Sequence, residues 1–218
     1  MKMRNLALAS AVALGGIGMT AVSAPAEAGV SGNIGVMSKY YFRGTLEADQ
    51  ATGFGGVDYE HSSGLYAGTW LADLGDQMGI EYDVYGGWAG EFGGLGVLVG
   101  VTTYNYTRDD RITELNLGLG YDFGGFFVDL EFSAGEVDDD ADTEYTFLAV
   151  TLGYDALSLT YGTFDDDFEG DYVELGYSVS VADQLDVDFA LGYADEDITG
   201  GNPDEYLMVT LTRGFDLF

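Results

Sequence analysis

Residues 184–194 read Q-L-D-V-D-F-A-L-G-Y-A, a stretch in which apolar residues alternate with polar or small ones. Successive side chains of a β-strand point to opposite faces, so this stretch predicts a strand with one apolar and one polar face. The same alternation recurs at 171–181 and 111–123. In 184–194 the apolar set is Leu185, Val187, Phe189, Leu191 and Tyr193.

The rest of the chain repeats this period in segments bounded by Gly, Asp or Asn, which are typical turn residues. No segment after Gly29 contains the roughly 18 uninterrupted apolar residues of a membrane helix, whereas each predicted strand is long enough to cross a bilayer when tilted. A membrane role would therefore require strands. The twelve predicted strands are 33–43, 51–60, 64–73, 78–89, 94–106, 111–123, 125–135, 143–154, 157–164, 171–181, 184–194 and 205–217.

The connections between these strands distinguish a membrane barrel from a soluble β-sandwich, which also shows alternation. Connections after odd-numbered strands hold four to ten residues, and those after even-numbered strands hold one to four. Outer-membrane barrels combine an even strand number with short periplasmic turns and longer external loops. We therefore predict an all-β fold, a transmembrane antiparallel up-and-down β-barrel of about 12 strands.

Composition excludes several classes of function. The chain has 218 residues with 38 Asp and Glu, 7 Lys and Arg, one His and no Cys. This charge excludes a basic nucleic-acid binder, and the lack of Cys excludes thiolate metal and redox sites. The single histidine, His61, precedes Ser62 and Ser63 in a predicted short turn, where neighbouring side chains are poorly placed for general-base catalysis. We therefore expect neither an enzyme nor a cofactor.

The first 28 residues have the pattern of a secretory signal peptide. Lys2 and Arg4 precede a run of small and apolar residues at 6–22, and A-E-A at 26–28 resembles a cleavage site. We expect residues 1–28 to be removed and residues 29–218 to form the barrel. The expected location is the bacterial outer membrane, reached through the periplasm.

Aromatic residues gather near the predicted strand ends, where Tyr and Trp prefer the membrane interface. Trp70 and Trp88 are interpreted as interfacial anchors. At the tail, either Phe215 ends the last strand or a bulge shifts the register before Phe218. The predicted girdles contain Tyr40, Tyr41, Phe42, Tyr104, Tyr106, Phe123, Phe126, Phe127, Tyr145, Tyr154, Phe164, Tyr172, Tyr193 and Phe215.

Three segments carry a resemblance to a known family. They are S-K-Y-Y-F-R-G at 38–44, F-G-G-V-D-Y-E-H-S-S-G-L-Y-A-G-T-W at 54–70 and E-Y-D-V-Y-G-G-W-A-G at 81–90. With them the chain resembles the TorF family of porin-like outer-membrane proteins, also known as the Gcw_chp family. The resemblance implies an outer-membrane barrel with a porin-like role and leaves the solute undefined. The R-G-F-D-L-F tail runs past the usual terminal aromatic of the family.

The polar faces of the predicted strands would line the barrel interior. Twelve strands enclose more space than side chains fill in an eight-stranded barrel, so a narrow aqueous pore is predicted. Carboxylates along such a pore concentrate cations, so we expect passage of small cationic or neutral hydrophilic solutes. The pore-lining candidates are Lys39, Arg43, Asp58, Glu81, Asp83, Glu114, Asp129, Glu131, Glu174, Asp186, Asp188 and Arg213.

Two alternatives stay open at this stage. Lys39 and Arg43 share one face of the predicted strand 33–43 and form either a basic ladder at a constriction or a charge cluster that links this strand to its neighbours. The barrel is either a pore or a closed, non-conducting structure whose acidic loops act in adhesion or envelope structure. The acidic runs at 138–142 and 164–171 lack the spacing of a calcium loop and are interpreted as solvated. Expected partners are outer-membrane lipids and lipopolysaccharide, the barrel-assembly machinery and small solutes, with a monomer or homotrimer as assembly.

Overall fold

The computed structural model describes residues 28–76 and 78–218. The predicted signal peptide, residues 1–28, lies outside these residues except for Ala28. Within the described ranges, no helix is long and apolar enough to cross a membrane.

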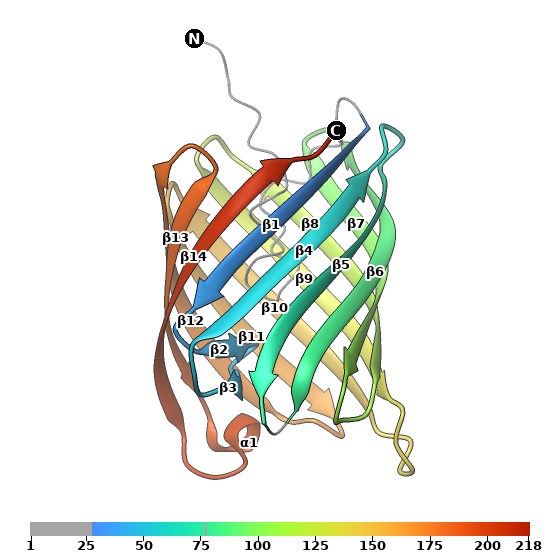
Figure 1. Cartoon of the computed structure of the whole chain (residues 1–218), viewed down its shortest axis with the longest axis vertical. Helices are drawn as coiled ribbons and strands as arrows, with labels where there is room; N and C mark the ends of the chain where they lie inside the picture. Colours follow the sequence, from blue (N-terminus) through green and yellow to red (C-terminus); the bar gives the residue numbers. More distant parts are fainter. Residues whose placement is uncertain (1–27, 77) are drawn as a thin grey trace.

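Twelve antiparallel strands close into one barrel (Figure 1), which confirms the predicted fold. Strands adjacent in the barrel are also consecutive in the chain, except that β1 pairs with β4 and β14 closes the barrel against β1. The barrel strands are β1 (Gly29–Met37), β4 (Thr52–Glu60), β5 (Leu65–Gly75), β6 (Gly79–Phe92), β7 (Leu95–Tyr106), β8 (Ile112–Asp122), β9 (Phe126–Val137), β10 (Glu144–Tyr154), β11 (Leu157–Asp166), β12 (Gly170–Ala182), β13 (Leu185–Ala194) and β14 (Asp204–Asp216).

The two ends of the barrel differ in the length of their connections. Tight turns at 93–94, 155–156 and 183–184 lie at the end where β1 begins and β14 ends (Figure 1). The opposite end carries the longest connections, 38–51 and 195–203, the second of which contains the short helix α1 (Glu196–Thr199). By the usual orientation of such barrels, we call the first the periplasmic end and the second the external end.

Strand alternation turns the apolar side chains outward. Leu115, Leu191 and Leu207 are exposed on the outer surface, while their chain neighbours face the lumen. A soluble sandwich would bury this apolar face, so its exposure fits a hydrocarbon environment.

The prediction that residues 33–43 form the first strand is wrong. β1 ends at Met37, and residues 38–51 turn inward and form a hairpin of β2 (Tyr40–Phe42) and β3 (Thr45–Ala48). Three consecutive aromatic residues, 40–42, break the apolar-polar period that a barrel strand needs. Arg43 and Gly44 both have positive φ, 48° and 83°, as the two central residues of a type I′ hairpin turn require.

The last strand, β14, ends at Asp216. It pairs with β1 from Ser31 opposite Asp216 to Met37 opposite Thr210 without a register shift. Phe215 therefore lies within the strand. The β14 pairings contain no bulge before Phe218, so that alternative is wrong.

Candidate functional site

The hairpin at residues 40–48, here called the lumen hairpin, lies inside the external half of the barrel. Tyr41 stacks on Tyr206 of β14 with ring centroids 4.0 Å apart. Tyr40 packs against Trp70 of β5 at 5.6 Å, and Phe42 lies 5.7 Å from Tyr104 of β7. The hairpin thus contacts opposite parts of the wall and narrows the lumen.

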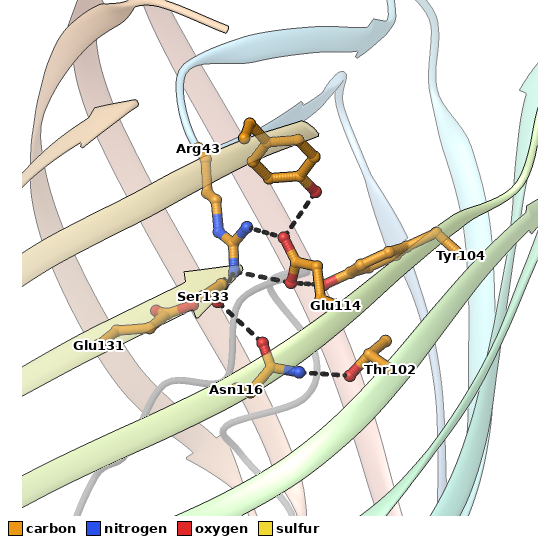
Figure 2. Close-up of polar contacts among 8 residues, drawn as sticks. Arg43, Thr102, Tyr104, Glu114, Asn116, Glu131 and Ser133 are labelled. Atoms are coloured by element: carbon orange, nitrogen blue, oxygen red, sulfur yellow. Dashed lines mark hydrogen bonds and ion pairs between the residues drawn. The ribbon is translucent and has the colours of Figure 1, made fainter. Parts of the chain in front are cut away.

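Arg43 at the tip of the lumen hairpin binds two carboxylates of the wall (Figure 2). Its Nη1 donates to Oε1 of Glu114 at 2.6 Å, and its Nη2 donates to Oε1 of Glu131 at 2.6 Å. Nη2 also donates to Oγ of Ser133 at 3.1 Å. The guanidinium carbon lies 4.0 Å from the ring centroid of Phe147. Arg43 therefore ties the hairpin to β8, β9 and β10.

Hydrogen bonds extend this ion pair along the wall (Figure 2). The hydroxyls of Tyr104 and Tyr145 donate to the two oxygens of Glu114 at 3.0 and 2.7 Å. Ser133 donates to Oδ1 of Asn116, which in turn donates from Nδ2 to Thr102. Glu114 is fully buried, so these partners offset the cost of removing its charge from water.

The charge of Arg43 is stabilised where it lies. Burial disfavours the charged guanidinium, but the carboxylates of Glu114 and Glu131 hold the pKa of Arg43 well above its usual value. One cation shared by two carboxylates leaves a net charge of about −1 at this point, with both acids satisfied.

A second group of acids, the carboxylate cluster of Glu47, Glu81 and Asp83, has a different environment. Glu81 and Asp83 are 1% and 6% exposed, and neither Oε2 of Glu81 nor Oδ1 of Asp83 has a hydrogen-bond partner. Burial, the charge of Glu81 and the charge of Asp109 together raise the pKa of Glu47 on β3 to about 8.

The cross-strand neighbours of Glu81 and Asp83 supply no positive charge. In the register of β5, β6 and β7, these neighbours are Ala72, Trp70, Tyr106 and Tyr104. The cluster therefore lacks a counterpart of Arg43 on the adjoining strands.

The periplasmic half of the lumen is lined differently. Ser178 and Ser180 face the interior and donate to Asp188 and Asp186 of β13, yet both serines remain exposed. Tyr85 donates to Asp58 in the same way. Solvent therefore reaches the β12 and β13 side of this half, whereas Ala89 and Leu98 form a small buried cluster on β6 and β7.

Ten of the twelve predicted pore-lining residues face the lumen, and the structure brings five of them together in two places. Arg43 joins Glu114 and Glu131 at the hairpin tip. Glu81 and Asp83 lie together on β6. The remaining five are Asp58, Asp129, Glu174, Asp186 and Asp188, with Glu174 accepting a hydrogen bond from Tyr206 at 2.8 Å.

Lys39 and Arg213 were predicted wrongly. Arg213 pairs with Ile34 and Leu185, which face outward, so its side chain lies on the outer surface. Its sequence parity matches that of Leu211, and alternation alone requires this orientation. Lys39 precedes the lumen hairpin and binds Asp49 at 2.5 Å, so no basic ladder with Arg43 exists on the first strand.

Several predicted interfacial aromatics instead pack inside the barrel. Trp70 is buried in the lumen and is not an interfacial anchor. Its parity, opposite to that of Leu71, already favoured the lumen. The girdle residues that are buried in the lumen or pack against its buried clusters include Tyr40, Tyr41, Phe42, Tyr104, Tyr106, Tyr145, Phe164 and Tyr172.

Sequence reasoning missed Glu47, Ser133 and Asn116. Glu47 fell in the predicted first loop, and only the inward fold of the hairpin brings it near β6. Ser133 and Asn116 lie on the polar faces of predicted strands, so alternation placed them in the lumen without indicating their contacts.

The fold and the polar lumen define the class to which the chain is similar, the barrels of outer-membrane channels. A solved KdgM porin matches with a TM-score of 0.60 at 7% sequence identity, over 86% of this chain and 99% of that one. The COG4313 outer-membrane channel from Pseudomonas putida F1 matches with a TM-score of 0.55 at 12% identity, over 91% of this chain and 98% of that one. No curated protein matches in sequence.

The chain belongs to the family described as "Bacterial protein of unknown function (Gcw_chp)", which matches residues 21–208. This match confirms the resemblance to the Gcw_chp family. The name TorF is not part of the family description, and neither is a function.

Proposed function

We propose that residues 29–218 form an outer-membrane channel for the passive diffusion of small hydrophilic solutes, with a preference for cationic or neutral ones. Residues 1–28 would act as the export signal. The chain would lie among outer-membrane lipids and lipopolysaccharide after insertion by the barrel-assembly machinery, as a monomer or homotrimer. The proposed role is the passage of solutes, without a catalysed reaction.

The imbalance of charge in the lumen carries this proposal. Arg43 is already bound by Glu114 and Glu131, and Lys39, in the same inward connection, is bound by Asp49. The other inward acids therefore give the lumen a negative potential, which concentrates cations in a water-filled passage. The shared fold with solved porin and channel barrels supports the same reading.

The lumen hairpin favours a second candidate, a barrel closed to solutes. Tyr40, Tyr41 and Arg43 are all buried, so the hairpin occupies much of the external half. In this alternative the acidic external connections would act in adhesion or envelope structure.

Single-channel recording of the protein refolded from residue 29 separates the two candidates. In a planar bilayer under a potassium chloride gradient, we expect discrete current steps and a reversal potential on the potassium side. A reversal potential on the chloride side contradicts the cation preference. No steps from protein with heat-modifiable gel mobility, which shows that the barrel is folded, would favour the closed barrel.

A further inference from the structure

Three groups of lumen side chains share one arrangement across three neighbouring strands, and we call each group a triad. A tyrosine lies directly opposite a glycine, and that glycine lies directly opposite a carboxylate on the strand beyond. The tyrosine hydroxyl crosses the glycine and donates to the carboxylate. The triads are Asp58–Gly68–Tyr85 on β4, β5 and β6, Glu114–Gly135–Tyr145 on β8, β9 and β10, and Glu174–Gly192–Tyr206 on β12, β13 and β14.

The glycine of each triad leaves room for the tyrosine ring. A Cβ added at Gly68, Gly135 or Gly192 would lie less than 3.0 Å from the ring of its own tyrosine, which is closer than real Cβ atoms come. A strand glycine commonly marks such a close approach. Each ring therefore lies along the wall over its glycine, and an alanine there would push the ring toward the lumen.

At two triads the lumen hairpin packs where the ring lies along the wall. Tyr41 stacks on Tyr206 with ring centroids 4.0 Å apart and an interplanar angle of 7°. Arg43 binds Glu114, which also accepts a hydrogen bond from Tyr145 at 2.7 Å. The rings of these triads thus line the space that the hairpin enters.

The third triad, Asp58–Gly68–Tyr85, lies in the periplasmic half of the lumen. Within residues 28–76 and 78–218, the lumen hairpin makes no hydrogen bond, ion pair or ring contact with it. Tyr85 packs on one side against the buried cluster that contains Trp70, but Tyr85 and Asp58 are only half-buried. The space in front of this ring therefore belongs to the lumen.

We propose that Gly68 is a width-determining residue of the passage, because it seats the ring of Tyr85 against the wall, where Asp58 anchors the hydroxyl. The role in the passage rests on the proposed function, although the seating of the ring does not require an open pore. Tyr85 and Asp58 are positioning residues in this arrangement.

Thermal unfolding in detergent micelles tests the seating without requiring conduction. Overpacking strains a well-packed site, so we expect G68A to lower the Tm by about 3 °C or more. In the Y85A background, where no ring is displaced, G68A should change the Tm far less. The matched control is G214A on the lumen face of β14, because a Cβ at Gly214 meets no atom within 4 Å. Equal losses from G68A in the two backgrounds overturn the proposal.

Single-channel conductance tests the width. We expect G68A to lower the conductance by about one third or more, and to have no such effect in the Y85A background. G214A should leave the conductance unchanged. A conductance of folded G68A equal to that of the wild type overturns the width-determining role.

A second variant is used if G68A fails to fold. Y85F removes the anchor on Asp58, so the ring moves more freely and we expect the noise of the open-channel current to rise. Y172F is the matched control, because Tyr172 lies over Gly162 in the same way and donates no hydrogen bond among the described residues. Equal noise in Y85F and Y172F overturns the anchoring by Asp58.

The two measurements separate this proposal from the proposed function. A wild-type protein without current steps loses the channel function, and the Tm comparison then decides whether Gly68 seats Tyr85. A conducting protein in which G68A changes neither the Tm nor the conductance retains the channel function and loses the role of Gly68.

Discussion

The external and periplasmic halves of the lumen share the same twelve-stranded wall and the same alternation, yet the first contains a hairpin and the second is open to solvent along β12. The external half contains the lumen hairpin, whose Tyr40, Tyr41 and Arg43 are buried. In the periplasmic half, Ser178 and Ser180 face inward and remain exposed. A single connection between two strands therefore makes the two halves of the interior different.

Removing the anchor of the hairpin should give the largest effect. Arg43→Ala leaves the buried carboxylates of Glu114 and Glu131 without a cation, so we expect a loss of about 3–5 kcal/mol in the free energy of unfolding. Urea titration in micelles measures this loss. The matched control is Arg111→Ala, which breaks the exposed pair with Asp138 and should cost less than about 1 kcal/mol. Equal losses in the two variants would show that the hairpin tip is not anchored by charge.

Deleting the lumen hairpin should leave the external half of the lumen as open as the periplasmic half. Replacing residues 40–48 with a short Gly-Ser linker removes the aromatic and charged side chains from the external half. We expect the single-channel conductance to rise several-fold, on the order of 3-fold or more, since the barrel wall alone encloses more space than side chains fill. A Gly-Ser replacement of residues 139–142, in an external connection, is the control and should leave conductance unchanged. Unchanged conductance in the hairpin deletion would place the constriction elsewhere.

The pH dependence of selectivity probes the hairpin side of the constriction. The pKa of Glu47 is raised to about 8, so its carboxyl is mainly neutral at pH 7 and mainly charged at pH 9. The groups that face it are Glu81, Asp83, Asp109, Tyr40 and Tyr106.

Ionisation adds one negative charge beside the passage as the pH rises through 8. We therefore expect the potassium preference, measured by the reversal potential, to increase between pH 7 and 9. In E47Q this increase should shrink. An identical increase in E47Q would assign the titration to another group.

The smallest effect on the free energy of unfolding is expected in the periplasmic half of the lumen. Ser180→Ala removes an exposed hydrogen bond to Asp186, which water replaces, so the free energy of unfolding should fall by about 0.5 kcal/mol or less. Ser133→Ala is the buried counterpart and should cost about 1–3 kcal/mol, because Arg43 and Asn116 each lose a partner. Equal costs from urea titration would contradict the distinction between the two halves.

Strand alternation predicted most of the wall. The predicted strand 184–194 is observed as Leu185–Ala194, and 111–123 as Ile112–Asp122. The same alternation placed Glu81, Glu114 and Glu131 in the lumen. The same alternation requires Arg213 to face outward together with Leu211. The prediction that Arg213 lines the pore was wrong because it did not follow this pattern.

Strand alternation could not predict that the first connection, residues 38–51, folds inward. Residues 40–42 are aromatic without a period, and such a run is compatible with an interfacial girdle or with a packed interior. The pairing of Arg43 with Glu114 and Glu131 joins residues 71 and 88 positions apart in the chain. Local sequence patterns carry no information about contacts at that separation.

The sequence by itself determined a closed barrel with an apolar exterior, because period-2 alternation fixes the face of each strand residue. Only the tertiary structure decided which acids share Arg43 and which remain without a partner. The physical reason is that a charge in the lumen is stabilised by whatever packs against it across the barrel. Here that is a hairpin whose inward fold depends on contacts with many strands at once.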